Sequence, residues 1–354
     1  MKRLRVGIIG TGMAFERLHL PAFQRLSQEY ELVALADLEF NKARAWGEKL
    51  GISEAHIYDD YRKMISEEDL DVIDIIVPIP LNFRITQEVA EMVAHSHRGI
   101  ICEKPLGSNL EEIEAARELP RRYGVPIMIA ENYRYDAETD LLRDFVREKR
   151  VGDVVYFLQN RVVNMPQDML GNQFAAKEWR QHPVYPGGVI TDTAVHDIGA
   201  LRHIFGAIKQ VQAFGVPCQE DWSPFLVINA NFQFYSGVTG HFSFYCAGME
   251  MQRPLIGLRI FGTEGMIYLE EKDAGTINIA YNDGSQEQIP YQPEQGFYRE
   301  LLNFHKAMNH EEPIAVTPEL EFGDTLTVLK MVESAANDGE VLPVDEVAEY
   351  AVTY

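Results

Sequence analysis

The first 130 residues alternate between short apolar runs and longer stretches with helical periodicity. The apolar runs are typical of buried strands, and they are Leu4–Ile9, Glu31–Ala36, a short run from Ile57, Val72–Val77, Ile100–Cys102 and Pro126–Ala130. Helical stretches separate them, at Ala14–Gln28, Asn41–Leu50, Leu81–Ala94 and Leu110–Tyr123. Strands that alternate with helices of this length predict an α/β unit with a parallel, doubly wound sheet.

From Gly152 onward the pattern changes to strand after strand, with few helices between them. The expected strands are Val154–Leu158, Val211–Val216, Phe225–Phe234, Val238–Cys246, Leu255–Phe261, Met266–Leu269 and Thr276–Tyr281. Tight turns such as Tyr235–Gly237 and Asn282–Ser285 separate several of them. This predicts an α+β domain with a large, mainly antiparallel open sheet, closed by helices at Gly296–Asn309 and Pro318–Asn337. We place the boundary between residues 1–128 and 129–354.

Composition and charge narrow the class of protein. The 354 residues carry a formal net charge of −22, which argues against nucleic acid or an anionic membrane as a partner, because both favour basic surfaces. Three widely spaced cysteines (Cys102, Cys218 and Cys246) form no disulfide framework. With no apolar run of 18 residues, we expect a cytoplasmic protein.

The first strand ends in Gly10-Thr11-Gly12, and Met13 and Ala14 open the following helix. Such a turn lets the backbone approach a pyrophosphate, which the helix N-terminus stabilises. Asp37 ends the second strand, 25 residues after Gly12, where an acid grips the ribose hydroxyls of a dinucleotide. A third small residue is expected at position 15, where this chain has Phe15. The pattern predicts a dinucleotide-binding Rossmann domain in which Ala14 substitutes or the helix stands further from the sheet.

Glu103-Lys104-Pro105 follows the fifth apolar run. Open α/β sheets bind ligands beyond the carboxyl ends of their strands, and Pro105 restricts the backbone of Lys104 to extended conformations. We therefore expect the Lys104 ammonium to point into the ligand site. The alternative is a surface lysine whose charge is paired with Glu103.

A second group of polar residues follows Gly187-Gly188. Asp192 and His196 are four residues apart, so on a helix they share one face. A carboxylate beside an imidazole fixes the histidine tautomer and raises its basicity, although a simple helix ion pair gives the same spacing. His203 lies on the same face, but a metal site would need a third ligand at a recognisable spacing. We expect no metal.

Together these motifs resemble the Gfo/Idh/MocA oxidoreductase family, which includes glucose–fructose oxidoreductase and inositol 2-dehydrogenase. The resemblance covers residues 4 to about 342. It implies an NAD(P)-dependent oxidoreductase that acts on a secondary alcohol of a sugar, polyol or derivative, with Lys104, Asp192 and His196 as the catalytic trio. It further implies the cofactor-binding residues Gly10, Thr11, Gly12, Met13, Ala14, Asp37, Pro78, Glu103, Lys104 and Asn132. Besides the trio, the implied substrate-binding residues are Tyr133, Arg134, Trp179 and Arg180.

One stretch departs from the family pattern. The family often has Thr-Pro-Asn-x-x-His after the fourth strand, whereas this chain has Val77-Pro78-Ile79-Pro80-Leu81-Asn82. Two other activities stay open: an NAD-dependent glycoside hydrolase that oxidises the sugar transiently, and a non-catalytic NAD or sugar sensor. The intact trio argues against the sensor, which needs no positioned proton acceptor.

Three finer expectations complete the hypothesis. His196 is the expected base, because an imidazole titrates near neutral pH, with Asp192 orienting it and Lys104 donating to the reacting oxygen. NAD is preferred over NADP, because Asp37 is followed by Leu38-Glu39-Phe40 with no cation for a 2′-phosphate. The aromatic residues on the second domain's strands predict a homodimer or homotetramer formed through its sheet.

Overall fold

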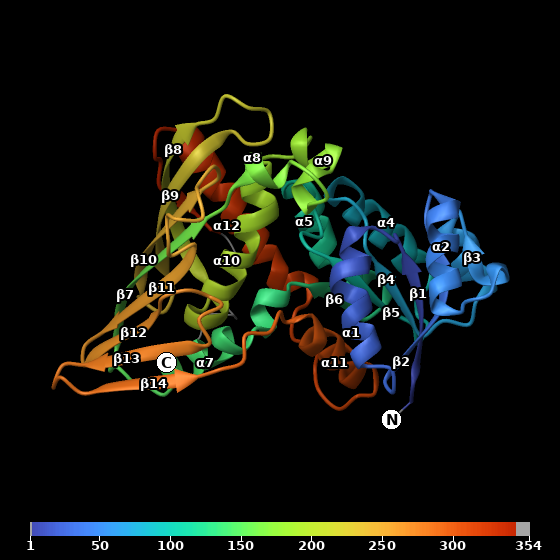
Figure 1. Ribbon diagram of the computed structural model, residues 1–354, viewed down its shortest axis with the longest axis horizontal. Coiled ribbons are helices and arrows are strands. Elements are labelled where there is room, and N and C mark those ends of the chain that lie inside the picture. Colours follow the sequence, from blue (N-terminus) through green and yellow to red (C-terminus); the bar gives the residue numbers. More distant parts are fainter. Residues whose placement is uncertain (1, 345–354) are drawn as a thin grey trace. The chain divides into compact units, whose positions relative to one another are not determined.

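The computed structural model describes residues 2–344, and its internal contacts divide the chain into two compact units (Figure 1). The first unit contains residues 1–132 and 296–322, and the second contains 133–295 and 323–354. The sequence-based boundary places residues 129–132 and 296–322 in the second part, whereas the contacts place them in the first unit. In the described residues, no helix is long and apolar enough to cross a membrane.

The first unit is built on a six-stranded sheet in the order β3-β2-β1-β4-β5-β6. Its strands are β1 (Leu4–Ile9), β2 (Tyr30–Ala36), β3 (Ile57–Tyr58), β4 (Val72–Ile75), β5 (Gly99–Glu103) and β6 (Ile127–Ala130). Every neighbouring pair is parallel. This confirms the predicted doubly wound sheet, and Lys104 directly follows the fifth strand as expected.

The first unit also contains helices, most of which connect these strands. They are the π-helical segment Phe15–His19, α1 (Leu20–Arg25), α2 (Phe40–Leu50), α3 (Tyr61–Glu67), α4 (Ile79–Met92), α5 (Leu110–Arg117), α6 (Leu119–Tyr123) and α11 (Phe297–Met308), with a 3₁₀ turn at Glu54–His56. The stretch predicted as one helix at 110–123 is divided in two, with Pro120 in the first turn of α6. A proline is tolerated there because the first N–H groups of a helix have no intrahelical partner.

Helix α11 explains why residues 296–322 belong to the first unit. Phe297, Leu301 and Phe304 are buried in the same apolar core as the β1 residues Val6 and Ile8. The Tyr30 hydroxyl also donates a hydrogen bond of 2.7 Å to the carbonyl of Leu301. A long-range contact of this kind, across some 270 residues of sequence, leaves no mark in local periodicity.

The second unit contains a nine-stranded sheet in the order β14-β13-β12-β11-β7-β10-β9-β8-β15. Its strands are β7 (Val154–Val162), β8 (Ile208–Pro217), β9 (Phe225–Phe234), β10 (Thr239–Tyr245), β11 (Ile256–Gly262), β12 (Gly265–Leu269), β13 (Thr276–Tyr281), β14 (Gln286–Pro290) and β15 (Leu342–Pro343). Strands β7 and β10 run parallel, whereas the other neighbouring pairs are antiparallel. The predicted mainly antiparallel sheet is confirmed.

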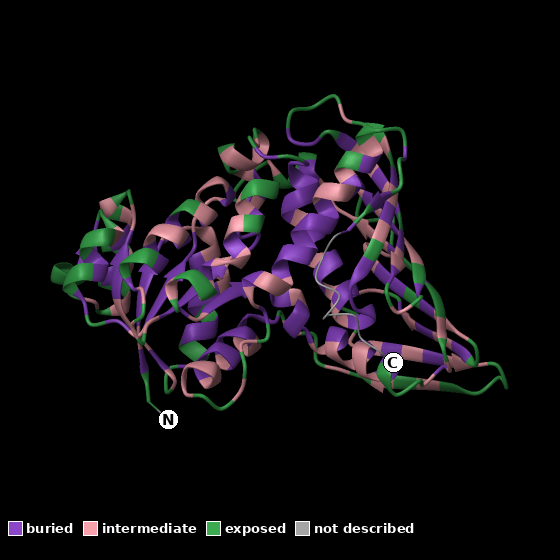
Figure 2. Ribbon diagram, turned by 180° about the vertical axis from the view of Figure 1, so that it is seen from behind, coloured by how far each residue is buried: buried purple, intermediate pink, exposed green. Residues whose placement is uncertain are grey.

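Helices cover one face of this sheet (Figure 1). The unit's helical segments are the 3₁₀ helix Asn132–Tyr135, which begins at the unit boundary, then α7 (Ala137–Arg147), α8 (Met165–Asp168), a 3₁₀ turn at Phe174–Ala176, α9 (Glu178–Gln181), α10 (Val189–Phe205) and most of α12 (Pro318–Ala336). Helix α10 is buried along most of its length (Figure 2). Its Phe205 stacks on Phe157 of β7 at 4.9 Å, and Ser334 of α12 accepts a hydrogen bond from the Ala213 backbone of β8.

Candidate active site

The glycine turn after β1 is tightly packed at Gly10 and open at Gly12. Gly10 has a φ of +96°, and a Cβ atom there would lie 2.1 Å from the carbonyl oxygen of Ile76. Only glycine fits this position. A Cβ atom on Gly12 would meet no protein atom within 4 Å. The space over Gly12 is therefore not filled by the described part of the chain, and it lies at the start of a helix, where anions bind.

Asp37 is tied to this turn. Its Oδ2 accepts hydrogen bonds from the backbone N–H and the hydroxyl of Thr11, both at 2.8 Å. Its Oδ1 accepts from the backbone N–H of Glu39 at 2.9 Å. The sequence-based prediction placed no cation beside Asp37, but the Lys42 ammonium lies 3.5 Å from it. A helix beginning at Phe40 turns Lys42 back toward the strand end.

Phe15, at the position where a third small residue was expected, is fully buried. Its ring packs edge-on against Trp46 of α2, with centroids 5.6 Å apart. The helix begins with π-helical turns over Phe15–His19, which are wider than α-helical turns. The aromatic residue thus belongs to the core, while Gly12, Met13 and Ala14 stay partly exposed.

Lys104 is 8% exposed, and its backbone is held on both sides. The buried Asn82 side chain donates to the carbonyl of Glu103 at 3.0 Å and to that of Pro105 at 2.8 Å. The Glu103 carboxylate accepts from the Lys104 N–H at 3.2 Å. The Lys104–Pro105 peptide bond is cis. Asn82 is a residue that sequence reasoning passed over, although it stands where the family pattern has a histidine.

A buried ionic group lies directly behind this loop. His19 is fully buried, and its Nδ1 and Nε2 atoms lie 2.8 Å from Asp74 and 2.9 Å from Glu103, respectively. Burial would lower the pKa of His19, but the two carboxylates raise it well above the ordinary value. His19 therefore joins Asp74 of β4 to the carboxylate beside Lys104, a contact that nothing in the sequence pattern indicated.

Glycines shape the start of α10, which carries the other two members of the trio. Gly187 and Gly188 have φ values of +81° and +52°, and a Cβ atom on Gly188 would lie 2.3 Å from the carbonyl oxygen of Trp222. Asp192 is 7% exposed and accepts a hydrogen bond of 2.6 Å from Nε of Arg180. The Arg180 guanidinium also lies over the Trp179 ring at 4.1 Å. The structure thus brings Asp192, Trp179 and Arg180 together, and their role in binding substrate stays a prediction.

His196 lies one turn after Asp192, and its ring stacks on Tyr133 with centroids 4.6 Å apart and planes 21° apart. Arg134 differs from expectation. Its side chain is 3% exposed, and its guanidinium bonds both oxygens of Asp324, which also pairs with Arg202. This ion pair holds Arg134 within the second unit, and its predicted contact with substrate stays a prediction. His203, the histidine considered for a metal site, lies 3.0 Å from Asp140.

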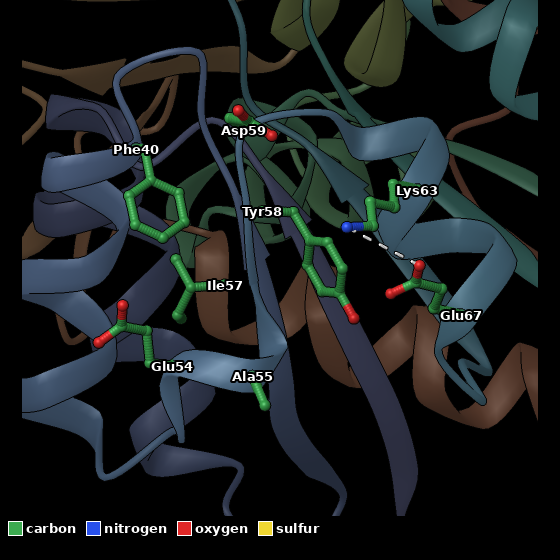
Figure 3. A pocket seen from close by; sticks show the side chains of 8 residues that line it. All are labelled: Phe40, Glu54, Ala55, Ile57, Tyr58, Asp59, Lys63 and Glu67. Atoms are coloured by element: carbon green, nitrogen blue, oxygen red, sulfur yellow. Dashed lines mark ion pairs between the residues drawn. The ribbon is translucent and has the colours of Figure 1, made fainter.

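Two predicted cofactor residues occupy element ends. Pro78 caps the N-terminus of α4, and Asn132 begins the 3₁₀ helix after β6. Separately, a pocket opens beside the edge strand β3, where Phe40 and Tyr58 line it and Lys63 lies 3.9 Å from Glu67 (Figure 3). The residues that line this pocket include no predicted site residue.

Comparison with known proteins defines the family. Residues 4–131 match the model of an oxidoreductase family with an NAD-binding Rossmann fold, and residues 139–268 match the GFO/IDH/MocA C-terminal domain. The chain belongs to the Gfo/Idh/MocA oxidoreductase family, which confirms the resemblance seen in its motifs. It is an NAD(P)-binding oxidoreductase whose distant relatives include sugar dehydrogenases.

Three similar proteins show which relatives the chain has. An uncharacterized protein of Saccharomyces cerevisiae is 23% identical over 98% of this chain and 100% of its own length. A D-xylose 1-dehydrogenase (NADP(+)) of Haloferax volcanii is 24% identical over 94% of this chain and 97% of its own. The solved structure of levoglucosan dehydrogenase in complex with NADH superposes with a TM-score of 0.83, at 21% identity over 98% of this chain and 100% of that one.

Proposed function

We propose that this protein is a dehydrogenase that transfers a hydride between a nicotinamide cofactor and a secondary alcohol of a sugar, a polyol or a derivative. The observation that carries the proposal is Lys104, held by Asn82 and Glu103 directly beyond β5 of the NAD-binding unit. The relatives named as xylose and levoglucosan dehydrogenases support the substrate class.

The residues present fit the cofactor. Gly10, Thr11 and Gly12 would hold the pyrophosphate with Met13 and Ala14 of the helix start, and Asp37 would hold the ribose. The open space over Gly12 supports this assignment. Pro78, Glu103 and Asn132 are the proposed contacts at the nicotinamide end. When bound, the nicotinamide accepts or gives up the hydride, which carries two electrons.

Side chains of the protein accept the hydroxyl proton and stabilise the reacting oxygen. In the oxidation direction the hydroxyl proton goes to His196 while the carbinol carbon loses the hydride, so the alcohol becomes a carbonyl. Lys104 donates a hydrogen bond to the same oxygen and stabilises the negative charge that develops there. Asp192, oriented by Arg180, bonds His196 or a neighbouring substrate hydroxyl. Trp179 and Arg180 complete the proposed substrate side.

We further propose NAD as the preferred cofactor. A carboxylate bonds two ribose hydroxyls but repels a 2′-phosphate. At roughly 4 Å the repulsion is worth about 1 kcal/mol in water and about 4 kcal/mol near a protein surface. Lys42 partly offsets this charge from 3.5 Å, so NADP binding is weakened rather than abolished.

A substrate screen tests the function directly. The purified protein is incubated with NAD and a panel of sugars and polyols, and NADH absorbance is followed together with analysis of the sugar product. We expect at least one sugar or polyol to give NADH and the matching ketone or lactone in equal amounts. Release of a free sugar from a glycoside without net NADH would instead favour the hydrolase.

A further inference from the structure

Tyr133 makes contacts that differ from those of a substrate-binding residue. Its ring stacks on His196 with centroids 4.6 Å apart. The Lys272 ammonium lies over the same ring, 2.9 Å from its centroid. The Tyr133 hydroxyl accepts a hydrogen bond of 2.8 Å from the Arg161 guanidinium. The phenol ring is thus contacted by the proposed base, by an ammonium and by a guanidinium, all within the second unit.

The two cations are themselves fixed. Lys272 is paired with the buried Asp136 and lies 3.9 Å from Glu138, and its side chain is 16% exposed. Burial lowers the pKa of Lys272, but Tyr133, Asp136 and Glu138 outweigh it and raise this pKa above its ordinary value. A charged lysine over an aromatic face is attracted by the ring's electrons, most strongly where water is excluded.

Arg161 is anchored in the same way. Its guanidinium lies 3.9 Å from Asp197, the residue after His196, and its side chain is 12% exposed. Asp197 is 1% exposed and accepts a hydrogen bond of 2.7 Å from Gln159. Arg161 therefore contacts both the Tyr133 hydroxyl and Asp197, which lies beside His196 on α10.

We propose that Tyr133 is a positioning residue for the base, and that its ring, fixed by Lys272 and Arg161, holds the His196 imidazole in the orientation needed for proton transfer. The proposal rests on His196 being the base of the proposed reaction. Proton transfer requires hydrogen-bond reach between base and hydroxyl, and a misplacement of about 1 Å costs on the order of 100-fold in rate. A stacked ring restrains the imidazole plane, whereas a lone histidine can rotate about its side-chain bonds.

Two substitutions separate positioning from substrate contact. Tyr133→Leu removes the ring and should lower kcat by roughly 10- to 100-fold, with little change in KM for the substrate. Tyr133→Phe removes the hydrogen bond with Arg161 but keeps the ring, its stacking on His196 and the Lys272 contact, so it should retain most of the turnover and the wild-type KM. Tyr235→Leu is the matched control, because Tyr235 is an exposed residue of the β9–β10 turn in the same unit.

If Tyr133 bound the substrate through its hydroxyl, Tyr133→Phe would raise KM by tenfold or more while sparing kcat. That result overturns the proposal. Because Tyr133→Phe changes little of the ring packing, comparing its KM with that of wild type tests the proposal even if Tyr133→Leu does not fold.

A measurement without substrate keeps this proposal separate from the proposed function. Diethylpyrocarbonate modifies neutral imidazoles, and peptide mass spectrometry gives the rate at His196 alone. We expect wild type and Tyr133→Phe to react at similar rates, and Tyr133→Leu to react several-fold faster because one face of the imidazole is uncovered. Equal rates of His196 modification in all three proteins would contradict the proposed stacking of Tyr133 on His196. Absence of any nicotinamide-linked turnover in wild type would instead overturn the proposed function and leave this comparison intact.

Discussion

At the scale of single residues, Asn82 is the side chain whose role the structure makes clearest. It stands where a histidine was expected and instead donates to the carbonyl groups on both sides of Lys104. We expect Asn82→Ala to lower turnover roughly tenfold or more, because Lys104 loses two backbone anchors and small displacements at a reacting centre are costly. Steady-state kinetics with NADH titration measure this.

Asn309→Ala provides the control for Asn82→Ala. Its side chain donates to the His305 carbonyl at the end of α11, in the same unit, and we expect unchanged turnover. If Asn82→Ala were as active as this control, the two hydrogen bonds would not hold Lys104 for catalysis.

Cofactor preference also depends on individual residues. We expect wild type to bind NAD more tightly than NADP, Asp37→Ala to narrow the difference, and Lys42→Ala to widen it, since Lys42 is the cation beside Asp37. Fluorescence titration of the three proteins with NADH and NADPH gives these three comparisons. Equal or tighter binding of NADPH by wild type would refute the preference.

At the scale of elements, helix α11 carries a buried acidic residue, Glu300, in the first unit. Glu300 is fully buried, and neither carboxylate oxygen has a hydrogen-bond partner among the described residues. Burial raises the pKa of Glu300 well above its ordinary value; the charge of His19 opposes this, and Glu103 and Glu131 add to it. The folded protein therefore holds a proton here that the unfolded chain releases above pH about 4.3.

The raised pKa of Glu300 predicts how the stability of the protein changes with pH. Because the folded state binds the extra proton, the contribution of Glu300 to stability falls as pH rises from about 4.3 toward its folded pKa. Glu300→Gln removes this dependence, so its stability relative to wild type should increase with pH. Thermal unfolding from pH 4 to 9 measures the difference, with the exposed Glu311→Gln as control. A difference that is constant with pH would mean that Glu300 is charged in the folded state.

The strands and helices were the features that the sequence predicted best. The period of the apolar residues predicted the parallel sheet, and the Glu-Lys-Pro stretch predicted that Lys104 follows its fifth strand. What the pattern could not give were contacts between distant segments: α11 in the first unit, β7 parallel to β10, and Arg134 paired with Asp324. Local periodicity records which face of an element is buried, and it does not record the partner that buries it.

At the scale of the whole molecule, the nine-stranded sheet has a face that the protein's own helices do not cover in the described residues. Phe157 and Gln159 of β7 are buried, so Tyr156 and Leu158 point to the opposite face, where they are 39% and 42% exposed. Phe214 and Val216 of β8 are 53% and 51% exposed. Apolar patches of this kind mark interaction surfaces, and we propose a homodimer or homotetramer through this face.

The assembly can be tested by adding a charge to that face. We expect wild type to be an oligomer by light scattering at micromolar concentration, and Leu158→Arg to shift it toward the monomer without loss of helical signal. Val184→Arg is the control, because Val184 is an exposed apolar residue in a loop. A monomeric wild type would contradict the proposed assembly.

The central claim is that His196 removes the hydroxyl proton of a sugar or polyol while Lys104 stabilises the same oxygen. The most direct measurement is turnover of His196→Ala, Lys104→Ala and the double variant on the substrate found by the screen, with NADH binding measured in parallel. We predict that each single substitution lowers turnover by roughly 10²–10⁴, that cofactor binding stays nearly intact in His196→Ala, and that the double variant loses less than the product of the two. Near-normal turnover of His196→Ala, with NADH still bound, would contradict the account.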